Sequence, residues 1–273
     1  MSDIRRPAVA GTFYPSKPAE LQRMVEGMLG RVDAEPAGAV AGIAPHAGLV
    51  YSGESAANVF KRIALPPLVV ILAPNHTGRG DNMGGAGAWS RGAYGTPIGN
   101  HPIAEDFMTR LENECSLVAH DPAAHMYEHA IEVELPFLSL LSPNVPVAPI
   151  VLAWSDWGSC KQLADALVRV VRKTEDNVLL IASSDMTHYE SADSAARKDR
   201  MALEAVERLD GQELLHRCAK ERISMCGRAP AAIVIESARQ LGATRAQVVD
   251  YRHSGWVTGD DSSVVAYAGV VIH

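Results

Sequence analysis

The chain has 273 residues, of which 47% are hydrophobic and 21% charged, a balance typical of a folded globular protein and not of a disordered one. The net charge of −7 disfavours nucleic acid as a partner, because phosphate binding needs a basic surface. No run of about 18 apolar residues occurs in the sequence, so we expect no membrane span and no membrane partner.

The cysteines and the first residues of the chain bear on its compartment. The N-terminal sequence MSDIRRPAVAGTFYP has no apolar stretch of signal-peptide length. The four cysteines lack CxxC spacing, and free thiols without an export signal are typical of the cytoplasm. We therefore expect a cytoplasmic protein with reduced thiols at Cys115, Cys160, Cys218 and Cys226.

Apolar, strand-like runs alternate with amphipathic helical stretches along the chain. The glycine-rich stretch 77–95 lies within this alternation, so we expect it to be a long loop and not a linker. The pattern predicts one α/β domain over residues 1–273, with a mostly parallel or mixed central sheet flanked by helices. In chain order, the expected elements are helix 18–29, strand 39–44, helix 52–63, strand 68–73, helices 103–113 and 130–141, strand 145–152, helix 160–173, strand 178–183, helices 191–209 and 228–241, a weaker strand 247–252 and strand 264–272.

Three of the expected strands are each followed within a few residues by a histidine: His46, His76 and His188. The carboxyl ends of strands in an open α/β sheet form the edge where ligands bind. A neutral imidazole at that edge can bind a metal or move a proton. The competing interpretation is that each histidine only satisfies loop backbone or caps a helix. Three histidines at equivalent strand ends favour a functional site over that interpretation.

A metal site that keeps one position open needs at least three protein ligands. His46 and His76 supply two, and the residues alone leave the third open among Cys226, Asp185, His188 and an acid of the segment 128–134. Cys226 precedes an expected helix, where a thiol has a lowered pKa and forms a thiolate that binds iron, copper or zinc. It is therefore expected to be the most reactive cysteine. The alternative is a small residue that fits a tight turn.

The segment 125–134 concentrates protonatable side chains. On a helix, His125 and His129 would share one face, as would Glu128 and Glu132. Such groups can hydrogen-bond to ligand imidazoles and orient them, or can form a solvated helix start. These two interpretations remain open. The sequence lacks the motifs HExxH, GxSxG and GxxxxGK[ST], which disfavours a zinc protease, a serine hydrolase and a phosphate-loop enzyme.

Several motifs occur together and in order over nearly the whole chain. They are AGTFYP at 10–15, IAPHAGLVYSG at 43–53, LAPNHTG at 72–78, EHAIEVELPFL at 128–138, SSDMTHY at 183–189, MCGRAP at 225–230 and DDSSVVAYAG at 260–269. In these motifs the chain resembles the Memo family.

This resemblance implies a fold similar to that of the LigB-type class III extradiol dioxygenases, with a metal pocket at one edge of the sheet. It implies that His46, His76 and Cys226 bind the metal, and that Asp185 and His188 are further pocket residues. Related ring-cleaving enzymes bind non-haem Fe(II) with two histidines and a glutamate, whereas the corresponding ligand here would be Cys226. Prokaryotic members resemble component B of the AmmeMemoRadiSam system, which implies a radical-SAM protein and an AMMECR-type protein as partners.

Two functions are compatible with these observations. The first is a metal-dependent, dioxygenase-like oxidoreductase with Fe(II) or copper, and zinc as the other candidate. In it, His188 would act as acid/base, and Asp185 would orient His188 or accept a hydrogen bond. The second is a non-enzymatic protein that sequesters a redox metal, or binds a small molecule or peptide, and presents it to partner proteins.

Overall fold

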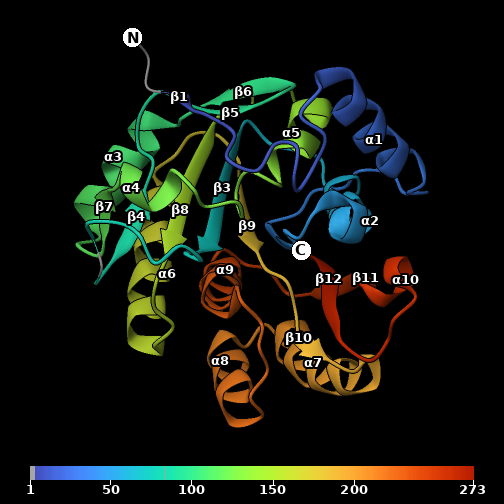
Figure 1. The fold of residues 1–273 in the computed structure, drawn as a ribbon. Coiled ribbons are helices and arrows are strands. Elements are labelled where there is room, and N and C mark those ends of the chain that lie inside the picture. Colours follow the sequence, from blue (N-terminus) through green and yellow to red (C-terminus); the bar gives the residue numbers. More distant parts are fainter. Residues whose placement is uncertain (1–3, 83) are drawn as a thin grey trace.

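The computed structural model describes residues 4–82 and 84–273, and a mixed β-sheet lies at its centre (Figure 1). Neighbouring strands in the sheet follow the order β10-β12-β2-β9-β3-β8-β4-β7, and β11 pairs with β12. The strand bounds are β2 Ala41–Ala44, β3 Leu68–Pro74, β4 Ala86–Ala88, β7 Val118–His120, β8 Val147–Leu152, β9 Val178–Ser183, β10 His188–Glu190, β11 Ala246–His253 and β12 Val264–Ile272.

The middle of the sheet is parallel and buried. Strands β2, β9, β3 and β8 run parallel to one another, while β12 and β4 flank them antiparallel. The runs LVVILA and VLLIAS are buried at every position, which is the pattern of strands covered on both faces. The predicted α/β fold with a mixed sheet is therefore confirmed.

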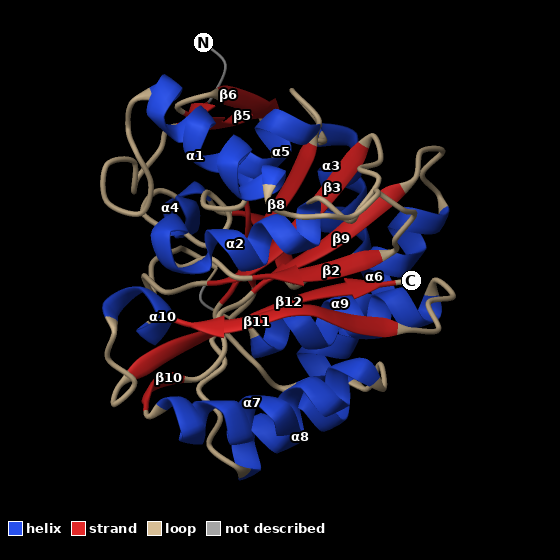
Figure 2. Ribbon diagram, turned by 90° about the vertical axis from the view of Figure 1, so that its right-hand side faces the viewer, coloured by secondary structure: helices blue, strands red, loops and turns tan. Residues whose placement is uncertain are grey.

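Helices cover the sheet on both sides, as the two views show (Figures 1 and 2). Helix α2 packs on β2, β11 and β12 and contacts α1 and α5, whereas α9 packs on β2, β3 and β9 and contacts α6 and α8. In the described part of the chain, no helix is both long and apolar enough to cross a membrane. The helix bounds are α1 Pro18–Gly30, α2 Leu49–Phe60, α3 Glu105–Glu114, α4 Pro122–His125, α5 Leu135–Leu141, α6 Trp157–Arg172, α7 Ala192–Glu207, α8 Gly211–Lys220, α9 Arg228–Gln240 and α10 Gly255–Thr258.

The structure differs from the sequence prediction in the glycine-rich stretch and in several helices. Part of 77–95 forms β4 and the start of β5 (Ala93–Thr96), which joins β1 (Ile4–Arg5) and β6 (Gly99–Pro102) in a small sheet. Helices α4, α8 and α10 were not predicted. The expected helix 130–141 begins only at Leu135, and the residues before it form turns.

Candidate metal centre

Three histidines converge at the carboxyl edge of the sheet. His46 and His76 follow β2 and β3, which flank β9 in the parallel part of the sheet, and His129 lies in the turns between α4 and α5. One ring nitrogen from each imidazole lies within 4.8 Å of the others. The ring centroids are 5.0 Å apart for His46 and His76 and 4.6 Å apart for His76 and His129. This cluster is able to hold a metal ion.

His46 is buried and hydrogen-bonded on one side of its ring. Its Nδ1 lies 2.8 Å from the Ser183 hydroxyl, which in turn lies 2.9 Å from Glu134 Oε1. Its backbone N–H donates to Asp185 Oδ1 at 2.8 Å. Burial, followed by the charge of His76, lowers the pKa of His46 to about 3. The ring is therefore neutral at pH 7, and its Nε2 is the nitrogen left to bind a metal.

Glu128 orients the other two histidines. Its Oε1 lies 2.9 Å from His76 Nδ1 and 3.4 Å from His129 Nδ1, and it also accepts from the backbone N–H groups of His129 and Ala130. Burial opposes ionisation of Glu128, but the hydrogen bond and charge of His76 outweigh it and lower the pKa to about 2. Burial, followed by the charge of His46, lowers the pKa of His129 to about 4. An ionised carboxylate that fixes imidazole Nδ1 atoms is the usual support of metal-binding histidines.

The structure separates the roles of the four residues between 125 and 132 that the sequence left open. Glu128 orients imidazoles, as one interpretation predicted, and His129 belongs to the cluster itself. His125 is buried away from the cluster and its Nε2 bonds to the Gly87 carbonyl. Glu132 forms a buried ion pair with Arg5. Residues 126–134 are not helical, because the Glu128 carboxylate accepts hydrogen bonds from the backbone N–H groups of His129 and Ala130.

Cys226 lies beside the cluster, with its Sγ 3.3 Å from His46 Nε2. The close approach depends on Gly227, where a Cβ would come within 2.3 Å of the Ser183 carbonyl oxygen. Burial, followed by the charge of Asp185, raises the pKa of the Cys226 thiol above its ordinary value. The prediction that the Cys226 thiol has a low pKa in the metal-free protein is therefore wrong. Burial raises this pKa by more than the nearby N-terminus of α9 lowers it. The ligand role of Cys226 stays a prediction.

Asp185 lies on the loop after β9, and His188 begins β10 a few residues later. The Asp185 carboxylate accepts from the backbone N–H groups of His46 and Ala47, so it holds the His46 loop. Burial raises the pKa of Asp185. His188 is half-buried, and its Nδ1 lies 3.1 Å from the Ser224 carbonyl oxygen. The Nδ1–H therefore donates to that carbonyl, and Nε2 carries the lone pair.

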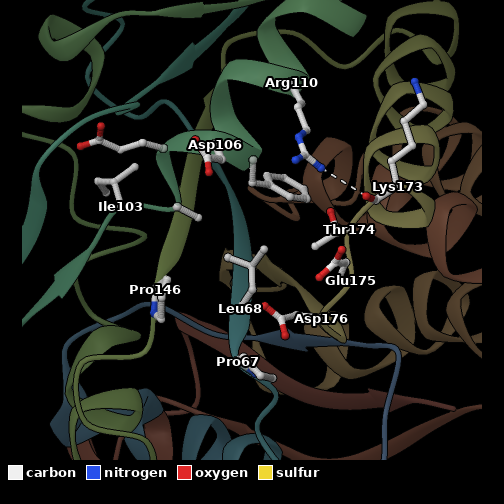
Figure 3. A pocket seen from close by; sticks show the side chains of 13 residues that line it. Pro67, Leu68, Ile103, Asp106, Arg110, Pro146, Lys173, Thr174, Glu175 and Asp176 are labelled. Carbon is white, nitrogen blue, oxygen red and sulfur yellow. Dashed lines mark hydrogen bonds between the residues drawn. The ribbon is translucent and has the colours of Figure 1, made fainter.

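Two pockets lie at opposite edges of the sheet. The pocket in Figure 3, of about 580 Å³, is lined by Leu68 and Pro146 at the amino ends of β3 and β8, so it is remote from the histidines. A smaller pocket of about 240 Å³ lies at the carboxyl edge, and both His76 and Cys226 line it. This smaller pocket is the space that is open to a ligand of the cluster.

The fold and the cluster define a class, an α/β protein with a three-histidine site able to hold a metal at the carboxyl edge of its sheet. The family model for Memo-like proteins matches residues 5–271. A MEMO1 family protein of Aquifex aeolicus is 40% identical over 269 residues, covering 98% of both chains. A MEMO1 family protein of Methanopyrus kandleri is 38% identical over 280 residues, again covering 98% of both. The chain belongs to the Memo family.

A solved structure supports the fold alone. The uncharacterised protein JW3007 from Escherichia coli K12 superposes with a TM-score of 0.52, covering 85% of this chain and 98% of that one. Its sequence identity is 13%, so the likeness concerns the architecture and not the site.

Proposed function

We propose that the protein binds one redox-active metal ion, Fe(II) or copper, through His46, His76 and His129, with Cys226 as a fourth ligand, and that it oxidises a small molecule. The observation that supports this proposal most is the convergence of three imidazoles, one nitrogen of each within 4.8 Å of the others. Imidazole and thiolate donors suit iron, copper and zinc, and not magnesium or calcium.

The residues present fit such a metal. The Nδ1 atoms of His46 and His76 are held by Ser183 and Glu128, so both rings present Nε2 as the nitrogen for a metal. Cys226 Sγ, 3.3 Å from His46 Nε2, would become a ligand beside it. Low pKa values keep the His46 and His129 rings neutral, so no proton has to leave them when a cation binds. A bound redox metal would supply electron transfer to or from the substrate or O₂. Zinc would fit the same donors but would supply no redox chemistry.

His188 is our candidate for the acid/base. Its Nδ1–H is held by the Ser224 carbonyl, so its Nε2 is the atom that accepts a proton from a substrate hydroxyl and returns it. Asp185 acts on the His46 loop, because its hydrogen bonds go to the backbone there. We therefore propose that Asp185 positions His46 and does not orient His188.

Metal content and oxygen consumption test the proposal together. The protein is produced in medium supplemented with iron or with copper, its metal is quantified anaerobically, and O₂ uptake is followed with a panel of catechols. One bound iron or copper per chain with O₂ uptake supports an oxidoreductase. A tightly bound metal without uptake favours the second function, a protein that holds a metal or ligand for partners such as a radical-SAM and an AMMECR-type protein. The absence of bound metal would refute the oxidoreductase and the metal-holding version of the second function.

We expect His188→Ala to separate metal binding from turnover. His188 hydrogen-bonds to Ser224 and does not belong to the three-histidine cluster, so the variant should keep its metal. Turnover should fall by about 10² to 10⁴, the usual contribution of a general acid/base. Elemental analysis and O₂ uptake measure the two effects. Loss of metal as large as in a His76 variant would instead make His188 a ligand.

We expect metal binding to release one proton from Cys226. Its thiol is protonated at pH 7 because burial raises its pKa, and a thiol must lose its proton to bind a metal. Affinity should therefore rise about tenfold per pH unit below the thiol pKa, and this slope should be lost in Cys226→Ala. Calorimetry in buffers of different ionisation enthalpy counts the protons. Equal release in both proteins would remove Cys226 from the ligand set.

A further inference from the structure

The small pocket beside the cluster contains groups that the proposed metal chemistry does not use. It lies between the carboxyl ends of β3 and β8 and the first turn of α9. His76 and Cys226 form the wall next to the metal ligands, and Trp154, Ser155 and Arg228 lie in the remaining wall. Its volume of about 240 Å³ suits a small chemical group and not a whole drug-sized molecule.

Arg228 is a half-buried cation without an acidic partner. Among the described residues, its guanidinium hydrogen-bonds to the Ser155 hydroxyl alone, at 3.5 Å, and no carboxylate lies within ion-pair distance. The buried Arg5 and the half-buried Arg217 and Arg252 each have an aspartate or glutamate partner. The half-buried Arg62 has no acidic partner either, but its guanidinium donates to the carbonyl and the side-chain oxygen of Asn58. A guanidinium has five N–H donors in a planar fork, and most of those of Arg228 remain available.

The rest of the pocket also favours a negative charge. Trp154 lines the pocket, and its indole N–H is buried and has no hydrogen-bond partner among the described residues. The Asn75 side chain is occupied within its own loop, by contacts to Thr77, Gly78 and Arg79. Neither aspartate nor glutamate is among the described residues that line the pocket. Unused donors beside a cation, without a competing carboxylate, form a binding site for an anion.

We propose that this pocket binds the carboxylate of a small organic acid substrate, with Arg228 as its main partner and the Ser155 hydroxyl and Trp154 N–H as further donors. The inference rests on the proposed function, because the body of the bound molecule would extend past His76 and Cys226 to the metal. Arg228 is then a specificity-determining residue that selects acids over neutral analogues. The planar fork of arginine matches the two oxygens of a carboxylate.

The test uses benzoate and acetate as probes and benzamide as the neutral analogue of benzoate. Binding is measured by calorimetry and tryptophan fluorescence on the metal-free full chain, so that it does not depend on the metal. Arg228→Gln removes the charge, Arg228→Lys keeps it without the fork, and Trp154→Phe removes only the N–H. Arg172→Gln is the matched control, because this exposed arginine at the end of α6 lines a pocket at the opposite edge of the sheet.

The wild type should bind benzoate more tightly than benzamide. Arg228→Gln should lower the affinity for benzoate by about tenfold or more, as expected when charged hydrogen bonds are lost. Arg228→Lys and Trp154→Phe should each weaken it several-fold, and Arg172→Gln should leave it unchanged. Unaltered binding in Arg228→Gln, equal weakening in Arg172→Gln, or failure of both acids to bind the wild type would overturn the proposal. Metal titration of the same proteins tests the metal site separately, because Arg228→Gln should leave metal affinity unchanged.

Discussion

Replacement of His46, His76 or His129 by alanine should weaken metal binding more than about 100-fold, since loss of an outer hydrogen-bond partner alone costs 10- to 100-fold. Each variant removes one of three converging imidazoles and leaves two of them with Cys226, and loss of a ligand should cost more than loss of its outer partner. The fold should survive, because His46 and His76 follow strands, His129 lies in turns, and none of the three belongs to the apolar core. Elemental analysis and thermal melting measure the two effects for each variant.

The control for these variants is His216→Ala, which removes an exposed histidine on α8. It should keep both metal and melting temperature. Unchanged metal in His129→Ala, with loss in the other two, would identify the third ligand as Cys226, as the family resemblance implies. A collapsed melting temperature without a specific loss of metal would mean that these histidines are structural.

The Glu132→Ala variant should lose about 3–5 kcal/mol of the free energy of unfolding, because it leaves a buried guanidinium without its counter-charge. Arg5 and Glu132 are both fully buried and ion-paired. The Glu132 carboxylate also accepts from the backbone N–H groups of Ala8 and Val9 and from the Tyr14 hydroxyl. These donors would lose their partner as well. Denaturant titration of the metal-free protein measures the loss.

The same variant should also weaken the metal site. Phe13, in the segment that Glu132 holds, packs against His129 with the ring centroids 4.6 Å apart.

The double variant Arg5→Met with Glu132→Leu is the matched control for the loss of stability in Glu132→Ala. It should regain only part of the stability, since a buried ion pair exchanged for apolar groups is often nearly neutral, whereas the N–H groups of Ala8 and Val9 and the Tyr14 hydroxyl still lack their acceptor. A loss below about 1 kcal/mol in Glu132→Ala, the usual value for an exposed pair such as Lys17–Glu20, would contradict the expectation.

The sequence predicted the buried strands well because their pattern is local. The runs 178–183 and 264–272 match β9 and β12 residue for residue, since continuous β-branched and apolar runs are typical of buried strands. Strand β4, with the sequence AGA, has no such signal and exists because β7 and β8 pair with it. Propensity could not reveal that pairing.

The sequence predicted those members of the histidine cluster that directly follow a strand. His46 and His76 follow strands, and the structure brings them together. His129 lies in turns between two short helices, and its position depends on Glu128 and on packing against Phe13, which no spacing in the sequence encodes. Trp154, Ser155 and Arg228 were not singled out, because their shared pocket arises from the meeting of β8 and α9. The presence of His129 beside Glu128 in an acidic, histidine-rich segment was the one available signal.

The central claim is that a metal ion binds between three histidines, and an anomalous-scattering map of crystals of the metal-loaded protein tests it most directly. Data collected on either side of the absorption edges of iron, copper and zinc identify the element and its position. We predict a single iron or copper peak at about 2.0–2.1 Å from a ring nitrogen of each of His46, His76 and His129, and about 2.3 Å from Cys226 Sγ, distances usual for such ligands. The absence of a peak there, or a peak that His129 does not contact, would contradict the claim.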